Sequence, residues 1–173
     1  MAIRSNLRSN RDQEVIDLGL GDILRELNKA DKSNTKVGYP AGGEVKSGTR
    51  KGSGRDPVDD ISEIAEIAAF NEFGTATTPA RSFVRSSFDE NLQKINSLKA
   101  RLYKRIIDGK ITTRRALGII GEAHLNQMKK KIRDIKEPAN APSTIRRKKG
   151  VNNPLIDTAQ MLNSAQHVEE IRV

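Results

Sequence analysis

The chain contains no cysteine, and only 3% of its 173 residues are aromatic. The absence of cysteine excludes disulfide bonds, thiolate metal ligands and cysteine nucleophiles. Hydrophobic residues make up 35% of the chain, which predicts a thin core for this length. We therefore expect a single domain that gains part of its stability from surface buried against neighbouring subunits.

Long apolar runs and common catalytic motifs are also absent. No apolar run approaches the roughly 20 residues of a membrane helix, and the basic N-terminus lacks the apolar core of an export signal. No phosphate-binding loop, zinc-protease motif or nucleophile elbow is present. His124 falls on the expected inner face of a helix, where a structural role is favoured, and Asp59 and Asp60 are best explained as a helix cap. We expect no catalytic, cofactor or metal site, and no enzyme.

Positive charge is concentrated in one block. Residues 99–149 carry 16 basic and 4 acidic side chains, a net charge of +12, within a chain whose formal net charge is +9. Such a block is typical of a surface that follows a phosphate backbone or docks on an acidic protein, although a solvated helix face gives the same pattern. Because Tyr103 is the only aromatic residue in the block, bases have little to stack on, and contact without sequence preference is expected.

Two clusters within the block are the candidate contacts with DNA or a partner. The first contains Lys129, Lys130, Lys131 and Arg133, and the second contains Arg146, Arg147, Lys148 and Lys149. We expect the first cluster to lie nearer to DNA and the second to meet a protein partner.

Hydrophobic periodicity predicts the elements in the first part of the chain. Residues 1–34 are expected to form a mobile arm, over residues 1–12, and then a short helix from Glu14. The region 35–173 is expected to form the main domain, which opens with a strand over Thr35–Pro40. Residues 41–57, rich in glycine, serine and charge, are expected to form a flexible loop.

Three further elements follow from the apolar spacing in the rest of the chain. A helix is expected to run from the Asp59–Asp60 cap to about Phe73, a long helix over Ser82–Asp108, and another from Thr112 or Thr113 to the prolines that follow residue 137. The long helix carries an apolar stripe that we expect to be buried: Val84, Phe88, Leu92, Ile95, Leu98, Leu102 and Ile106. A final strand over His167–Val173 is expected to pair with the first strand. The expected class is α+β, a small antiparallel sheet packed with two long helices and shorter helices.

The most patterned stretch is FNEFGTATTPARSF, residues 70–83. Gly74 is expected to end one helix, and Pro79 to fix φ just before the next, so this bend sets the angle between two helices. Arg81 is the expected polar lock, on helix-end carbonyls or on a neighbouring subunit's carboxylate, with an internal salt bridge as the alternative. The candidate residues of the bend and interface are Phe73, Gly74, Thr75, Pro79, Arg81 and Phe83.

Five segments follow one another in an order that resembles a known family. They are KVGYP, AEIAAFNEFGT, PARSFVRSSFDEN, PSTIRRKKG and NPLIDTAQML. Over about residues 35–173 the chain resembles the tail-completion, or neck, proteins of long-tailed double-stranded DNA bacteriophages, which are also described as virion morphogenesis proteins. FGT followed by PAR-x-F is the more specific part. Ser82 stands where the family usually has proline and Ala159 where it usually has glycine, which leaves open the backbone angles of the second turn.

The resemblance implies a structural virion protein without catalytic residues. It implies a homo-oligomeric ring at the head–tail junction, with a hexamer favoured and a dodecamer as the alternative. The implied partners are other neck and tail proteins and the double-stranded DNA in the channel, with no membrane. The implied location is the virion, and the host cytoplasm during assembly.

Among the neck layers, tail completion is favoured over adaptor, stopper and tail terminator. The alternative function is that of a basic accessory protein that binds DNA without sequence preference through residues 99–149.

Overall fold

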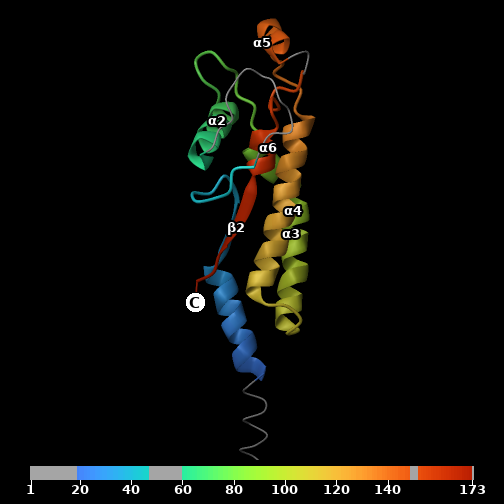
Figure 1. Cartoon of the computed structure of the whole chain (residues 1–173). Coiled ribbons are helices and arrows are strands. Elements are labelled where there is room, and N and C mark those ends of the chain that lie inside the picture. Colours follow the sequence, from blue (N-terminus) through green and yellow to red (C-terminus); the bar gives the residue numbers. More distant parts are fainter. Residues whose placement is uncertain (1–18, 47–59, 149–151, 173) are drawn as a thin grey trace, which may run out of the picture.

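The computed structural model describes residues 19–46, 60–148 and 152–172. These residues form a two-stranded antiparallel sheet packed with helices, so the predicted α+β class is confirmed (Figure 1). The mobile arm predicted at residues 1–12 lies outside the described residues, as do residues 47–57 of the predicted flexible loop. The described part of that loop, residues 41–46, contains neither helix nor strand.

The sheet joins two segments that lie far apart in the sequence. Strand β1 (Asn34–Gly38) pairs antiparallel with strand β2 (Gln166–Glu170), as the sequence predicted. A two-stranded ribbon is marginal by itself, and this one packs against helix α4 (Thr113–Asp134). The approach is close at Gly121, where an added Cβ would lie 2.7 Å from Thr35 Oγ1 on the sheet.

The two long helices lie side by side as an antiparallel hairpin (Figure 1). Helix α3 (Val84–Ile107) starts two residues after the expected position, and α4 begins after its N-cap Thr112, whose hydroxyl accepts the N–H of Arg115 at 3.3 Å. A helix that includes residues 19–32 packs across the turn end of the hairpin and leads into β1.

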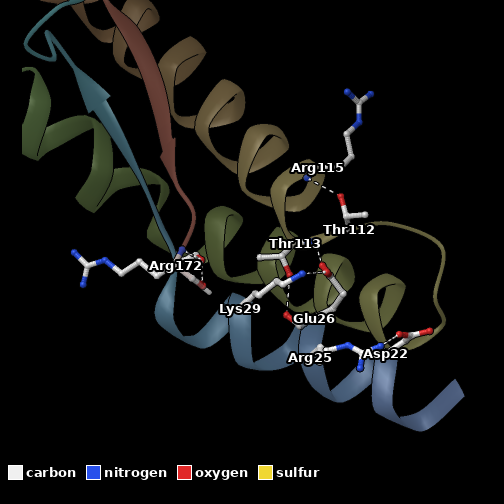
Figure 2. Close-up of polar contacts among 9 residues, drawn as sticks. Asp22, Arg25, Glu26, Lys29, Thr112, Thr113, Arg115 and Arg172 are labelled. Atoms are coloured by element: carbon white, nitrogen blue, oxygen red, sulfur yellow. Dashed lines mark hydrogen bonds and ion pairs between the residues drawn. The ribbon is translucent and has the colours of Figure 1, made fainter. Parts of the chain in front are cut away.

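Helix α4 is also capped from a distant part of the chain (Figure 2). The carboxylate of Glu26, on the residue 19–32 helix, accepts the backbone N–H of Thr113 at 2.7 Å, and the Thr113 hydroxyl donates to the Glu26 carbonyl at 2.7 Å. Lys29 pairs with the same carboxylate at 3.0 Å. The backbone hydrogen bond from Thr113 and the bond from Lys29 lower the pKa of Glu26, so this carboxylate is ionised at neutral pH.

The core has two separate parts. The larger surrounds Phe83, Met128 and Ile132, where α2 (Ile61–Phe73) and α6 (Gln160–Ser164) meet α4. The smaller lies where α3, α4 and the residue 19–32 helix meet, and its buried members are Ile95, Leu102, Ile106, Ala116 and Ile120. A short helix, α5 (Pro142–Arg147), projects at the end of the molecule opposite the hairpin turn (Figure 1).

One expectation for the core is wrong. The apolar stripe of α3 is not buried along its whole length, because Phe88 is 38% exposed and Leu92 is 41% exposed. The residue 19–32 helix packs on the C-terminal half of the stripe, around Leu102, and does not extend to the N-terminal half. The stripe therefore continues from the core onto the surface.

Candidate functional site

The bend between α2 and α3 is organised by a buried carboxylate. Glu72 is 4% exposed, and its side chain accepts the backbone N–H groups of Phe83 at 2.7 Å, Val84 at 2.8 Å and Arg85 at 3.2 Å. It also accepts the Ser82 hydroxyl at 2.7 Å. The first N–H groups of a helix have no partner within the helix, and a negative charge there is favourable. Glu72, the last but one residue of α2, therefore caps α3.

The charge of Glu72 is maintained in spite of its burial. Burial raises the pKa of Glu72, but the hydrogen bonds from Val84, Ser82 and Arg85 together outweigh burial and leave the pKa below its ordinary value of 4.5. The Arg85 guanidinium pairs with the carboxylate at 3.0 Å and also lies 4.9 Å from the centre of the Phe73 ring. Phe73 is thus held at the surface, 66% exposed, whereas Phe83 is fully buried.

Gly74 ends α2, as predicted, with φ of 78°. An added Cβ at Gly74 would lie 2.8 Å from the Ala80 nitrogen and 2.9 Å from the Thr78 carbonyl oxygen, so both the space and the backbone angle require glycine. Thr75 closes the turn that follows, since its N–H donates to the Thr78 carbonyl at 2.8 Å. Pro79 is exposed and lies between this turn and α3.

Arg81 fastens the bend to the segment that follows α4. It is 6% exposed, and it donates from Nε to the Pro138 carbonyl at 2.7 Å and from Nη2 to the Ala139 carbonyl at 3.1 Å. The predicted bonding to carbonyls is present, but these carbonyls lie beyond the helix end, and the described residues contain no carboxylate paired with Arg81. We therefore assign Arg81 to the fold of its own chain.

An open groove of about 590 Å³ lies beside the bend. Its walls come from four of the five segments that carry the family resemblance, represented by Asn71, Pro79, Thr144 and Leu155. The remaining segment, KVGYP, contacts the groove wall through the Tyr39 hydroxyl, which donates to the carbonyl of the lining residue Met161 at 2.9 Å. Segments spread over most of the chain thus meet around one groove.

The turn before α6 has a residue other than glycine with a positive φ. Ala159 has φ of 64° and ψ of 8°, in the left-handed region that favours glycine. The turn therefore has the backbone geometry that favours glycine, with alanine in its place.

In the second basic cluster, Lys148 is half-buried while its neighbours on α5 are exposed. Lys148 donates from Nζ to the carbonyls of Asn153 at 3.2 Å, Pro154 at 3.3 Å and Ile156 at 3.1 Å, so it braces the turn of the NPLID segment. Arg146 and Arg147 are exposed on α5. Lys149 lies outside the described residues.

The first basic cluster is partly neutralised within the chain. Lys130 pairs with Asp134 at 2.8 Å, and Lys131 pairs with Glu90. Burial, and then the nearby charge of Lys46, lower the pKa of Lys129. Arg133 is exposed, and its carbonyl accepts the Asn153 side-chain amide at 2.9 Å, which links this end of α4 to the NPLID turn.

Sequence reasoning missed Glu72 and Glu26, because each acts on a helix other than its own. The local capping signal relates residues three positions apart, whereas Glu72 caps residues 11–13 positions away and Glu26 caps Thr113 from 87 positions away. A glutamate directly before the F-G helix stop was the available signal for Glu72.

In the described ranges no group of three or more histidine, aspartate or glutamate residues is arranged to hold a metal ion. His124, expected to be structural, packs against Phe88 with the rings tilted by 53° and their centres 5.3 Å apart, and burial lowers the pKa of His124. None of the helices formed by the described residues has the length and apolar character to cross a bilayer. Comparisons with family models, with curated proteins and with solved structures find no match for the chain.

Proposed function

We propose that this chain is a structural subunit of a bacteriophage neck. It forms a ring that completes the tail at the head–tail junction and surrounds the DNA channel. The observation that carries the proposal is the groove beside the bend, because the five segments behind the family resemblance meet there. A chance likeness of short motifs gives no reason for such distant segments to come together.

The surface of the chain supports a role in assembly. Phe70 is 49% exposed and Phe73 66% exposed on α2, while Phe88 and Leu92 extend the core stripe onto the surface of α3. A chain with few aromatic residues thus leaves several large apolar side chains in solvent, and clusters of this kind mark interaction sites. The partners proposed are further copies of the chain, in a hexamer by preference, and the adjoining neck and tail proteins.

The DNA-binding alternative rests on the exposed Arg133, Arg146 and Arg147. It is weaker, because Lys130 and Lys131 form ion pairs within the chain and Lys148 braces a turn. We therefore propose contact with DNA from within an assembled ring, without sequence preference, and assign no catalytic residue, cofactor or metal.

Mass spectrometry of purified virions tests the proposal directly. The chain should be present at a fixed ratio to the other neck proteins, and phage that lack it should accumulate separate heads and tails. A chain that is absent from virions, with particles complete without it, would overturn the proposal. Tight binding to duplex DNA by the free chain would then favour the accessory function.

A further inference from the structure

Helix α2 is apolar on two opposite sides. Its buried side includes Ile64, which is 1% exposed, and Ala68, which is 5% exposed. The opposite side presents Ile67, 37% exposed, Phe70, 49% exposed, and Phe73 to solvent. The outer face of α2 thus keeps large apolar side chains in solvent, and no described residue covers them, although Ile67 and Phe70 also line the open groove beside the bend.

The charge of the outer face is of one sign. Residues 60–73 contain four acidic and no basic side chains. One of the four, Glu72, is buried at the bend, while Asp60, Glu63 and Glu66 are exposed. Two copies of this face would therefore bring like charges together, which disfavours symmetric pairing of α2 with itself.

A second surface is also apolar, but the charge around it is positive. An apolar groove of about 250 Å³ lies where α3 and α4 meet the start of β1, and its lining includes Phe88, Lys99 and Tyr103. Phe88 and Tyr103 are 38% and 43% exposed at its rim. The surrounding stretch, residues 94–115, carries eight basic side chains and one acidic side chain. The groove thus offers an apolar floor within basic surroundings.

We infer that the outer face of α2 on one copy docks into this groove on the next copy. The inference rests on the proposed function and deepens it, because it names the contact between ring subunits. In each chain α2 lies beside α6, away from the turn between α3 and α4, so the two surfaces belong to different parts of the molecule (Figure 1). Two different surfaces make a head-to-tail contact, and such contacts close into rings or extend as filaments.

Cysteine cross-linking tests this contact, because the native chain has no cysteine. The probes are full-length Phe70→Cys, on the outer face of α2, and full-length Tyr103→Cys, at the rim of the groove. Their mixture should form a disulfide-linked dimer on oxidation at increasing protein concentration, whereas neither variant alone should do so. Ser97→Cys is the matched control, since Ser97 is exposed on α3 and does not line the groove.

The outcomes separate the possible contacts. Cross-linking of Phe70→Cys with itself would show that α2 pairs with α2, and would overturn the inference. A yield from the Phe70→Cys and Tyr103→Cys pair that never exceeds the Ser97→Cys control would overturn it as well. Circular dichroism of each variant should match the native chain, so that loss of fold does not account for a low yield.

Charge reversal gives a second, independent readout. Glu66→Lys or Lys99→Glu alone should lower the cross-linking yield about twofold to fivefold, as expected for an exposed ion pair. A chain that carries both changes should recover the yield, because the attraction is restored with its signs exchanged. Yields that fall further in the double variant would contradict the docking of α2 into this groove.

This test is separable from the test of the neck assignment. A chain found in virions but without the cross-link would keep its neck role and lose this contact. A chain with the cross-link but absent from virions would keep the contact and lose the neck role.

Discussion

At the scale of single residues, the hydroxyl of Ser82 and the carboxylate of Glu72 explain how the bend is held without a proline after Arg81. A proline after Arg81 would fix φ before α3, and serine does not. The Ser82 hydroxyl instead donates to Glu72 at 2.7 Å, and the same carboxylate holds the first N–H groups of α3. The bend is thus fixed by hydrogen bonds to one buried charge.

Replacement of Glu72 by glutamine should lower the free energy of unfolding by about 2–4 kcal/mol at pH 7, because charge-assisted hydrogen bonds are replaced by weaker ones. The folded-state pKa of Glu72 lies below 4.5, so the carboxylate stabilises the fold above the unfolded-state pKa. This stability is lost as pH falls through the folded-state pKa.

Urea unfolding of both chains from pH 7 into acid measures this effect. The difference between native and Glu72→Gln should shrink below about pH 4.5. Glu63→Gln, an exposed acid on the same helix, is the control and should change little. If the free energy of unfolding of Glu72→Gln stayed below that of the native chain by the same amount down to strongly acid pH, the role of the charge would be contradicted.

At Ala159 a substitution is expected to stabilise the fold. Ala159→Gly should raise the free energy of unfolding by about 0.5–1 kcal/mol, because the strain of alanine in the left-handed region exceeds the added entropy of glycine in the unfolded chain. Ala100→Gly, at an exposed position inside α3, is the control and should lower the free energy of unfolding by about 1 kcal/mol. Thermal unfolding of the two variants measures the change in stability. A loss of stability in Ala159→Gly would contradict the assigned backbone angles.

At the scale of elements, both long helices are capped by glutamates from other helices. Glu72 of α2 caps α3, and Glu26 of the residue 19–32 helix caps α4. Helix positions follow from local periodicity, so the sequence predicted α3 and α4 to within about two residues at their starts. The caps depend on tertiary packing across 12 and 87 positions, and local patterns carry no information on such contacts.

Glu26→Ala should destabilise the chain by about 1–2 kcal/mol, because the Thr113 N–H at the start of α4 loses its acceptor. Asp22→Ala on the same helix is the matched control, since among the described residues Asp22 pairs only with Arg25, and both side chains are about 70% exposed. Hydrogen exchange should accelerate at the start of α4 in Glu26→Ala alone. Equal exchange rates at the start of α4 in the two variants would show that Glu26 does not cap this helix.

Arg81 links the bend to the segment after α4. Arg81→Ala should cost about 2–3 kcal/mol, because the Pro138 and Ala139 carbonyls lose a charged donor. Arg81→Lys should recover only part of this, since an ammonium cannot reproduce the planar geometry of the two bonds. Denaturant unfolding measures the free energy of unfolding of both variants. An Arg81→Ala chain with native stability that fails to assemble would show that Arg81 acts in the interface between subunits.

At the scale of the whole molecule, a short segment closed by Pro40 and a partly alternating segment from His167 predicted the β1–β2 pair, and this pairing is confirmed. The uncovered apolar surfaces were not predictable in the same way. Phe88 and Leu92 fit the predicted apolar stripe of α3, but whether such a side chain is covered depends on where distant elements stop, as the residue 19–32 helix stops short of Phe88. The groove beside the bend was missed for the same reason, although the residues of the bend itself were recognised.

The distribution of free positive charge over the molecule gives the last prediction. Within the described residues neither Lys129 nor Arg133 forms an ion pair, whereas Lys130 and Lys131 do. If this end of α4 contacts phosphates, Lys129→Gln combined with Arg133→Gln should flatten the dependence of log affinity on log salt by roughly 0.9 per lost contact.

Arg101→Gln combined with Arg105→Gln is the matched control, because it removes two exposed positive charges from α3. Titration of two duplexes of unrelated sequence at several salt concentrations makes the comparison. The control should leave the slope nearly unchanged, and the two duplexes should bind equally, because counterion release carries no sequence information. Equal slopes for both double variants would contradict a DNA contact at this end of α4, and a strong preference for one duplex would favour the accessory DNA-binding function over the neck ring.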